Sequence, residues 1–598
     1  MNMNFSFDPL QNKAPKGVVK KGTMVNFLVK ANGSDQNLTM FFCLKKDGDV
    51  AYEEHEMMIT KNGYCFSKYF EDSGHYFYHF KATSENETLF ICKTFNNYSY
   101  VSSEQGEDFF QSVINHNYNL KDSLQGGIIY QIFVDRFCKK GKVEVREPLV
   151  ERTDWGGAIK KNTTDPLKIN EEVFCGNFAG VESKLDYLKE LGVTTIYFNP
   201  ICYANSNHKY DTANYEVTDP MFGSLDDFKH LIKSAGDRNI NIIIDGVYNH
   251  TGSDSIYFNR YNRFNSVGAY NSKKSKYYPW FEFEDWPNKY KCWWGIDTLP
   301  ATKGHCPDFI EYIAGKNGII EKYLKLGVFG FRLDVLDELE DSFTKMISQK
   351  IAEFGETRPI IGEVWEDAST KISYGERKTY FANNEINSVM NYPIKESIIH
   401  YIKSKEPTEL ISTIRMLQNN YPKEVQDNLM NFLGTHDTNR IFTELSNIAG
   451  GDRILAKKYF KIAMSICFTV MGVPSIYYGD EYGMENNDGS SRGCFDWKHY
   501  KNDLFEYVLR LSKVRKQKCF VDGELNILFA KNGKFVFERK TEVSRAVICV
   551  NLKPTPLKIS LKGNFFNFFT KKPQKTFLLE ENECEILIDK SKDVINID

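Results

Sequence analysis

The chain has 598 residues, a length that accommodates about three to five domains. Its formal net charge is −3 and it has no long basic run, so nucleic acid and anionic membranes are poor candidate partners. Its 13 cysteines include no C-x-x-C pair, which argues against a disulfide framework and against a zinc site.

The first residues, Met1–Asp8, lack a basic segment followed by an apolar one, so we expect no signal peptide and a cytoplasmic location. The longest uncharged run, Ile462–Gly479, is interrupted by Gly472 and Pro474 and falls short of a membrane span. We therefore expect no membrane partner.

Residues 1–120 are typical of an N-terminal β-sandwich, because short apolar runs alternate with turn residues. The predicted strands are Thr39–Leu44, His55–Thr60, Tyr64–Phe70 and His75–Phe80. In the last strand, alternation puts Tyr76, Tyr78 and Phe80 on one face. We favour a sandwich core for that face over the alternative, a surface that stacks on carbohydrate.

Residues 121–518 alternate between strand and helix patterns. The predicted strands are Gly127–Phe137, Val193–Ile201, Ile240–Tyr248, Val328–Val335, Pro359–Trp365, Asn387–Tyr392, Asn428–Thr435 and Pro474–Tyr478. The predicted helices include Val181–Gly192, Leu225–Ala235, Asn317–Leu326, Ser342–Phe354 and Leu504–Lys516. Eight strands separated by helices predict an α/β fold, a closed (β/α)8 TIM barrel.

One connection in this barrel is unusually long: residues 251–316, after the third strand, are rich in Tyr, Trp, Asn and Lys. We expect an inserted loop subdomain above the C-terminal face of the barrel, where active sites lie. Its aromatic residues either form a platform for a distant sugar or pack the loop, and the sequence leaves both readings open. They are Tyr278, Trp280, Trp293 and Trp294.

Residues 519–598 return to a β pattern. The predicted strands are Leu525–Ala530, Lys534–Glu538 and Arg545–Leu552, and Asn532-Gly533 forms the turn between the first two. We expect a C-terminal β-sandwich with a structural role.

The strand Val328–Val335 is an apolar run with two charges, Arg332 and Asp334, on one face. Such charges either form a structural ion pair in the core or act on something. Other polar residues follow neighbouring strands, among them the carboxylates Glu363 and Asp437. Three converging carboxylates repel one another, so at least one should hold its proton near neutral pH, as retaining glycoside hydrolysis requires.

Taken together, these segments resemble the signature regions of the alpha-amylase family of glycoside hydrolases, in order and spacing. The matching segments are Asp245–His250, Gly330–Glu338, Gly362–Trp365 and Phe432–Asp437, supported by Tyr130–Phe137, His208–Tyr215 and Tyr477–Gly483. The likeness extends over about residues 120–515. The three-part organisation resembles the intracellular branch that includes neopullulanases, cyclomaltodextrinases and maltogenic amylases, although Thr298–Thr302 departs from the motif usual in that branch.

The resemblance implies that Asp334 is the nucleophile, Glu363 the acid/base and Asp437 the residue that stabilises the transition state. It also implies a set of substrate-binding residues. In this set, the ring of Tyr210 stacks on the sugar, His250 and His436 form hydrogen bonds to it, and Glu338 contacts the next sugar. Arg332 holds Asp334 ionised, Asp245 supports the site, and Arg440 braces it.

No cofactor or metal is expected. After Asp135, the chain lacks the acidic and Asn residues that usually bind calcium in this family, so calcium is not supported. Asn249 matches a calcium ligand of typical alpha-amylases, but we favour a structural hydrogen bond for it. The expected partners are an α-glucan oligosaccharide and, by resemblance, a second copy of the chain, whose N-terminal domain would cover the active site in a homodimer.

We therefore predict a retaining hydrolase of α-1,4-glucosidic bonds in maltooligosaccharides, cyclodextrins, pullulan or starch-derived glucans. The alternatives are an α-glucan transglycosylase of the same family and a catalytically inactive carbohydrate-binding or scaffold protein. All three carboxylates are present, which argues against the inactive protein.

Overall fold

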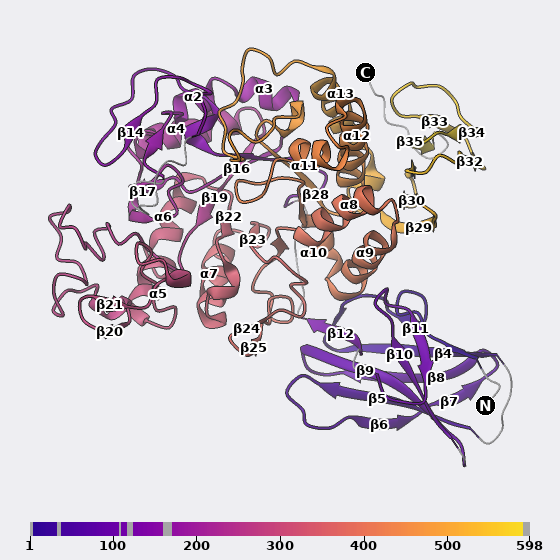
Figure 1. Cartoon of the computed structure of the whole chain (residues 1–598). Coiled ribbons are helices and arrows are strands. Elements are labelled where there is room, and N and C mark those ends of the chain that lie inside the picture. Colours follow the sequence, from indigo (N-terminus) through magenta and orange to yellow (C-terminus); the bar gives the residue numbers. More distant parts are fainter. Residues whose placement is uncertain are drawn as a thin grey trace.

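The computed structural model describes residues 4–32, 38–85, 87–106, 109–115, 123–159 and 170–589. Its centre is a sheet of eight parallel strands wrapped into a barrel (Figure 1). In spatial order these are β26 (Ser388–Val389), β23 (Ile360–Gly362), β22 (Gly330–Leu333), β19 (Asn241–Gly246), β16 (Thr195–Phe198), β13 (Ile129–Ile132), β28 (Val473–Tyr477) and β27 (Met430–Asn431). The barrel closes where Met390 pairs with Met430, which confirms the expected (β/α)8 fold.

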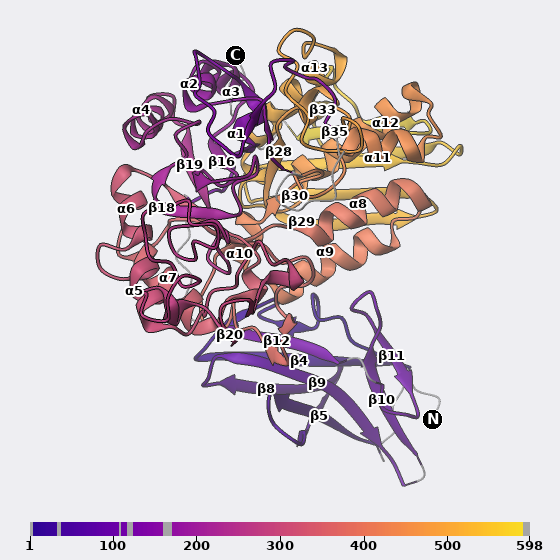
Figure 2. The ribbon, with the colours of Figure 1, turned by 60° about the vertical axis from the view of Figure 1, so that its left-hand side comes forward.

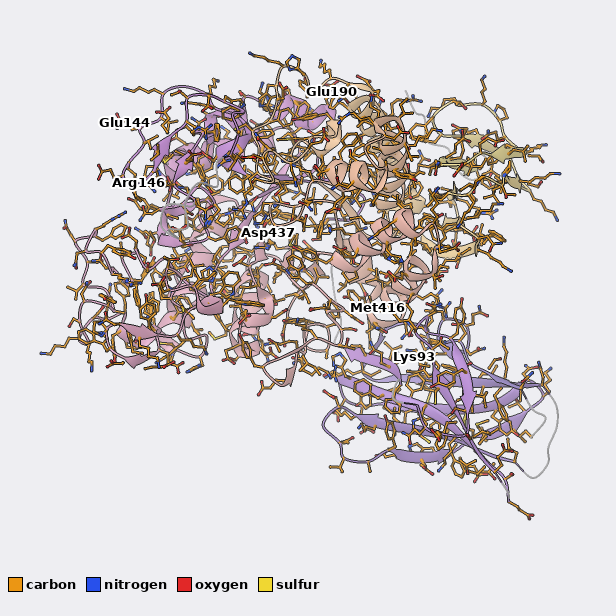
Figure 3. All side chains as sticks on the ribbon, viewed as in Figure 1. Lys93, Glu144, Arg146, Glu190, Met416 and Asp437 are labelled. Carbon is orange, nitrogen blue, oxygen red and sulfur yellow. The ribbon has the colours of Figure 1, made fainter. Side chains whose placement is uncertain are left out.

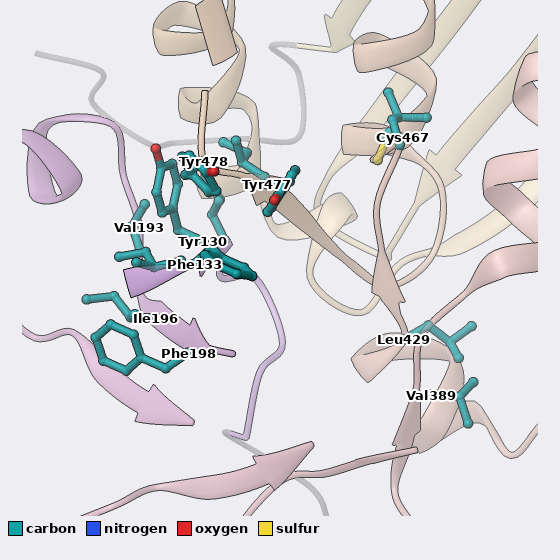
Figure 4. Close-up of a cluster of buried hydrophobic side chains, with 14 of the residues drawn as sticks. Tyr130, Phe133, Val193, Ile196, Phe198, Val389, Leu429, Cys467, Tyr477 and Tyr478 are labelled. Atoms are coloured by element: carbon teal, nitrogen blue, oxygen red, sulfur yellow. The ribbon is translucent and has the colours of Figure 1, made fainter. Parts of the chain in front are cut away.

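Helices surround this barrel (Figure 2). They include α4 (Leu225–Gly236), α5 (Pro307–Ala314), α6 (Ile319–Leu326), α7 (Asp341–Ala352), α8 (Tyr392–Ser404), α9 (Thr408–Asn420), α12 (Arg453–Thr469) and α13 (Asp503–Ser512). Strand β16 contributes to two separate cores. Ile196 and Phe198, labelled in Figure 4, belong to the cluster between the strands and the helices. Tyr197 points to the other face of the strand and belongs to the cluster inside the barrel.

Besides the strand predicted over Gly127–Phe137, which ends at Ile132 and is followed by the short helix α1 (Val134–Phe137), two predicted elements differ from the observed ones. The single helix predicted over Val181–Gly192 is wrong, because the segment forms two short helices, α2 (Phe178–Glu182) and α3 (Leu185–Glu190). Lys184 lies between them outside the helical region, with φ −113° and ψ 7°. The helical spacing of apolar residues continues through Lys184, so this spacing alone does not predict that the helix is interrupted there.

The second difference is in the N-terminal β-sandwich, where the strand predicted over His55–Thr60 is divided between two sheets. Strand β6 (Glu53–Glu56) pairs with β5 (Thr39–Lys46), whereas β7 (Met58–Thr60) pairs with β8 (Gly63–Phe70). The chain crosses from one sheet to the other at Met57, which is buried.

The two N-terminal sheets enclose an aromatic core. The remaining strands are β1 (Asn4–Ser6), β2 (Lys13–Ala14), β3 (Val19–Lys20), β4 (Thr23–Asn32), β9 (Gly74–Thr83), β10 (Thr88–Lys93), β11 (Ser99–Ser102) and β12 (Phe110–Asn115). Tyr78 and Phe80 of β9 are fully buried in this core, as the favoured reading of that face requires, and Tyr76 is half-buried at its edge.

The sandwich packs against α9 of the barrel. Arg415 pairs with Asp8 at 2.7 Å between Nη2 and Oδ1, and Ser412 donates to the carbonyl of Phe95 at 2.9 Å. Figure 3 marks Met416 of α9 and Lys93 of β10 at this junction. The predicted domain boundary at residue 120 lies outside the described residues.

The C-terminal strands form a five-stranded sheet and a two-stranded sheet. The larger contains β29 (Glu524–Lys531), β30 (Lys534–Lys540), β31 (Arg545–Asn551), β35 (Glu583–Asp589) and β33 (Phe565–Asn567), and the smaller contains β32 (Leu557–Ser560) and β34 (Thr576–Leu579). Arg539 anchors the larger sheet to the barrel by donating to the carbonyl of Thr469, at the end of α12. Over the described ranges, no helix combines the length and apolarity needed to cross a membrane.

Candidate active site

A cleft of about 1180 Å³ opens at the C-terminal ends of the barrel strands. Strand register determines which side chains lie at its base. Gly246, Leu333 and Gly362 are paired across β19, β22 and β23, so Asp334 and Glu363, the next residues of their strands, emerge at one level. Both line the cleft together with Asp437, which Figure 3 marks among the strand ends.

Arg332 is the charged centre of this base and is fully buried. Its Nη1 donates to Asp245 Oδ1 and to Asp334 Oδ1, each at 2.8 Å, and its Nη2 lies 2.7 Å from Glu363 Oε2. The sequence left two alternatives for Arg332 and Asp334, a structural ion pair in the core or a role in chemistry. The ion pair is present, but Asp334 and Glu363, which both contact Arg332, also line an open cleft. A purely structural core pair would not line such a cleft.

The carboxyl groups of Asp334 and Glu363 both contact the guanidinium of Arg332. Burial raises the pKa of Asp334 well above its usual value, the nearby charges of Glu363 and Asp245 add to the rise, and Arg332 opposes it. Glu363 accepts hydrogen bonds from Trp365 Nε1 at 3.1 Å and from the backbone N–H of Val335 at 2.9 Å.

Val335 follows Asp334 in the left-handed region, with φ +38° and ψ 55°. This conformation is strained for a β-branched residue, and such strain typically costs about 1–3 kcal/mol. The turn directs the N–H of Val335 at Glu363, so the backbone after one carboxylate holds the other in place.

Asp437 lies with His436 and Arg492. Its Oδ2 is 2.9 Å from His436 Nε2, and its Oδ1 accepts from Arg492 Nη2 at 3.1 Å. Burial alone would raise the pKa of Asp437, but these two neighbours outweigh it and hold the pKa well below its usual value. Asp437 is therefore ionised wherever the protein is folded near neutral pH.

His436 is oriented from its other nitrogen. Nδ1 faces the side-chain amides of Gln131 and Asn199, each at 3.1 Å, so Nδ1 accepts and Nε2 carries the proton toward Asp437. The ring of Tyr210 lies parallel to the His436 ring, with 5.2 Å between centroids.

Asp245 supports this arrangement from below. Its Oδ2 accepts from the hydroxyls of Tyr197, at 2.7 Å, and Tyr210, at 2.8 Å. Because its other oxygen accepts from Arg332, Asp245 fixes both the guanidinium and the Tyr210 ring.

His250 is buried beside the cleft, with its ring stacked on Trp293 at 5.4 Å between centroids. Burial lowers the pKa of His250 to about 4, so the ring is neutral at pH 7. Its Nε2 has no hydrogen-bond partner within the described part of the chain.

Two predicted residues lie away from the base. Glu338 lies at the rim, where its carboxylate accepts from Trp294 Nε1 at 3.2 Å and from the hydroxyl of Tyr374. Arg440 is fully buried and does not line the cleft; it donates to the carbonyl of Ser491 at 2.8 Å and to Asp480 Oδ1 at 3.0 Å. Arg440 thus contacts the loop that carries Arg492.

The four aromatic residues of the long insert divide between the two readings. Trp280 is buried against Phe309, at 5.1 Å between centroids, and Tyr278 stacks on Phe283 at 5.3 Å. Trp293 and Trp294 line the cleft, and Trp294 is 80% exposed. Packing and cleft lining are therefore both present.

The region proposed to have lost calcium is occupied by internal bonds. Asp135 Oδ1 accepts from the N–H groups of Phe174, at 3.0 Å, and Cys175, at 2.8 Å, and its Oδ2 pairs with Arg136 at 2.6 Å. In the ranges that the structure describes, no group of three or more His, Cys, Asp or Glu residues is arranged to hold a metal ion.

Sequence reasoning missed several contributors to the site, namely Gln131, Tyr197, Asn199, Tyr374 and Arg492. Asn199 could have been found, because it follows β16 just as the other site residues follow their strands. Arg492 lies in a loop 15 residues beyond the end of β28, and nothing in the local sequence sets it apart.

Comparison with known proteins agrees with this geometry. A family model described as the alpha-amylase catalytic domain matches residues 131–517. The amylopullulanase of Thermoanaerobacterium saccharolyticum is 28% identical over 95% of this chain, and a cyclomaltodextrinase of Thermoanaerobacter pseudethanolicus is 30% identical over 71% of this chain and 70% of its own length. The chain spans half or less of the length of the amylopullulanases that it matches.

Solved structures resemble the whole molecule. A cyclomaltodextrinase superposes with a TM-score of 0.71 at 22% identity, covering 98% of this chain and 99% of the other. The type III pullulan hydrolase from Thermococcus kodakarensis superposes with a TM-score of 0.69 at 22% identity, covering 98% and 100%. These two likenesses extend the shared fold beyond the barrel to both β-sandwiches.

Proposed function

The chain belongs to the alpha-amylase family, and we propose that it is a retaining glycoside hydrolase that cleaves α-1,4-glucosidic bonds. The observation that carries the proposal is the pairing of Asp334 and Glu363 on the single guanidinium of Arg332 at the base of a large cleft. A retaining mechanism requires two carboxyl groups close together on opposite sides of the bond to be cleaved, and the shared contact with Arg332 supports this closeness.

In the first step, Asp334 attacks the anomeric carbon while Glu363 gives its proton to the leaving glucosidic oxygen. This forms a covalent glycosyl ester on Asp334. In the second step, Glu363 takes a proton from water, the water oxygen attacks the same carbon, and Asp334 leaves as a carboxylate. Arg332 stabilises Asp334 as an anion each time it leaves.

Between these states the sugar ring is oxocarbenium-like. Asp437 remains ionised beside His436 and Arg492 and accepts bonds from hydroxyls of that sugar. The ring of Tyr210 stacks on the sugar, and the unpaired Nε2 of His250 bonds to a hydroxyl. Glu338 binds the next sugar, and Arg440 braces the loop from below.

The substrate class is α-glucans: maltooligosaccharides, cyclodextrins, pullulan or starch-derived chains. The cleft is larger than a single sugar requires, and Trp294 and Trp365 line it with exposed ring area. Similar proteins are named for cyclodextrin and pullulan, which supports this class. A cytoplasmic location and a homodimer formed through the N-terminal sandwich are part of the same proposal.

The test is product analysis of the purified protein incubated with maltohexaose, β-cyclodextrin, pullulan and starch. We expect short maltooligosaccharides from β-cyclodextrin and from maltohexaose, and we expect NMR to detect their α-anomer before the β-anomer. Products longer than the starting hexamer would make the protein a transglycosylase. Release of the β-anomer would contradict the retaining mechanism, and no change on any substrate would contradict the hydrolase.

A further inference from the structure

We propose that the N-terminal sandwich positions one wall of the cleft in its own chain, and that Asp47 and Gln111 are the positioning residues. The wall is residues 365–378, which follow Glu363. The inference rests on the proposed function, because it concerns where the leaving part of the glucan binds. Glu363 protonates the leaving oxygen, so the leaving sugars lie on the Glu363 side of the cleft, against this wall.

One face of the wall lines the cleft through Trp365, Glu366 and Lys371. Lys371 crosses to the loop after β22, where its Nζ lies 2.8 Å from Asp337 Oδ2. Tyr374 is 80% exposed, and its hydroxyl donates to Glu338 of the same loop. The wall therefore presents an aromatic ring and charged groups to whatever sugar lies beside Glu363.

The wall has little regular structure of its own. Its hairpin consists of β24 (Ile372–Ser373) and β25 (Glu376–Arg377), two residues each, joined by Tyr374 and Gly375 at φ +52° and +83°. Two-residue turns with both φ values positive suit hairpins, but a ladder this short is not stable alone in water. The hairpin therefore depends on contacts outside itself for its position.

The other face of the wall packs on the N-terminal sandwich. Arg377 Nε donates to Asp47 Oδ2 at 2.8 Å, and its guanidinium lies 5.0 Å from the centroid of the Phe77 ring. The same arginine donates to the carbonyl of Thr370 at 2.9 Å, closing the base of the hairpin. Figure 1 shows β24 and β25 between the barrel and the sandwich.

A second contact lies deeper. Gln111 of β12 donates through Nε2 to Ser369 Oγ at 3.0 Å, and both side chains are buried. Ser369 in turn donates to Asp367 Oδ1 at 2.7 Å. The buried amide of Gln111 thus holds the wall at Ser369, just before the hairpin, and the ion pair of Asp47 holds it at Arg377, the last residue of β25.

The chain offers a matched control. The pair Asp8–Arg415 also joins the sandwich to the barrel, but through α9 and not through the wall. If the sandwich merely stabilises the chain, loss of either ion pair should have the same effect. If it positions the wall, loss of the Asp47–Arg377 pair alone should weaken binding of the leaving sugars.

The experiment compares wild type with Asp47→Asn, Arg377→Gln, the double variant, Asp47→Glu, Gln111→Met and Asp8→Asn. Each is assayed on maltohexaose, whose leaving part is a sugar, and on α-maltosyl fluoride, whose leaving fluoride does not reach the wall. Unfolding midpoints are recorded for all variants.

We expect Asp47→Asn and Gln111→Met to raise KM for maltohexaose about three- to tenfold, a range typical of lost polar contacts. Their kcat on α-maltosyl fluoride should stay within about twofold of wild type. Asp8→Asn should leave both substrates unaffected. The double variant should match Arg377→Gln alone, because Arg377→Gln already removes the ion pair together with the bond to Thr370. Asp47→Glu should recover most of the loss.

An active wild type with unchanged KM in Asp47→Asn would overturn the inference, as would an equal effect of Asp8→Asn or an equal loss on both substrates. A wild type that cleaves neither substrate would instead overturn the proposed function, and the inference with it.

Discussion

The base and the rim of the cleft are built by different means. At the base, Arg332, Asp334 and Glu363 are buried and emerge from two paired strands, β22 and β23, so hydrogen bonds between backbones fix their relative height. At the rim, Trp294 and Tyr374 are exposed, stand on loops far apart in the sequence and meet through the carboxylate of Glu338. The residues proposed for bond cleavage are therefore positioned by backbone pairing of the barrel strands. The residues proposed for substrate choice are positioned by hydrogen bonds between side chains of separate loops.

The largest effect is expected at the base, from Asp334→Asn. The change is nearly isosteric, so the barrel should stay folded, but it removes the nucleophile, and kcat should fall by about 10⁴-fold or more. Activity on maltohexaose and the unfolding midpoint would be measured together. Asp337→Asn, three residues further along in the same cleft, is the control and should lose less than about tenfold; wild-type turnover in Asp334→Asn would exclude the assignment.

Glu363→Gln separates the second carboxyl group from the first. Removal of a general acid typically costs about 10²–10⁴-fold when the leaving group needs a proton. Fluoride needs none, so the loss of glycosyl transfer from α-maltosyl fluoride should be at least about tenfold smaller than the loss on maltohexaose. Equal losses on the two substrates would show that Glu363 does not act as the acid.

The packing between the barrel strands and the surrounding helices can be tested through Glu481, which is buried on the segment after β28. Its carboxyl accepts from Tyr130 at 2.7 Å and from Tyr187, yet burial raises its pKa from 4.5 to about 7. Because the folded protein binds this proton more tightly than the unfolded chain, the contribution to stability is full below about pH 4.5 and is lost as pH rises toward 7. The size is about 3 kcal/mol.

Glu481→Gln should abolish that dependence, because its amide oxygen still accepts from the tyrosines and does not titrate. Calorimetric unfolding midpoints between pH 5 and pH 8 would check it, with wild type losing stability more steeply than the variant. Parallel curves would mean that Glu481 does not titrate in this range.

The smallest effects are expected at the rim. Tyr374→Phe removes the bond to Glu338 and keeps the ring, whereas Tyr374→Ala removes both. If the ring contacts sugar, Tyr374→Ala should raise KM for maltohexaose about three- to tenfold, and Tyr374→Phe should raise it by less. The kcat should stay nearly unchanged in both, because a contact made equally in the ground state and in the transition state affects KM and not kcat. Trp294→Ala should behave like Tyr374→Ala. Kinetics on maltohexaose and maltotriose would decide, and unaltered KM in both alanine variants would remove the rim from substrate binding.

The same division explains what the sequence could predict. Arg332 and Asp334 stand out because charges inside a buried strand are rare, and the parallel order of the barrel then brings Glu363 beside them. Arg492 and Tyr374 belong to loops, whose course is set by distant contacts that local patterns do not contain. The resemblance implies that Arg440 braces the site, but only the structure identifies what it contacts, the carbonyl of Ser491 in the loop that carries Arg492.

The single guanidinium of Arg332 among Asp245, Asp334 and Glu363 has an electrostatic consequence. The single positive charge of Arg332 faces three acidic side chains in a poorly solvated setting, which leaves the base with excess negative potential. A sugar mimic with a protonated ring nitrogen should therefore inhibit more strongly than its neutral ring-oxygen counterpart, and phosphorylated glucans should be rejected. The ratio of the inhibition constants of such a matched pair would measure how strongly the negative potential at the base stabilises a positively charged sugar ring, such as the oxocarbenium-like transition state.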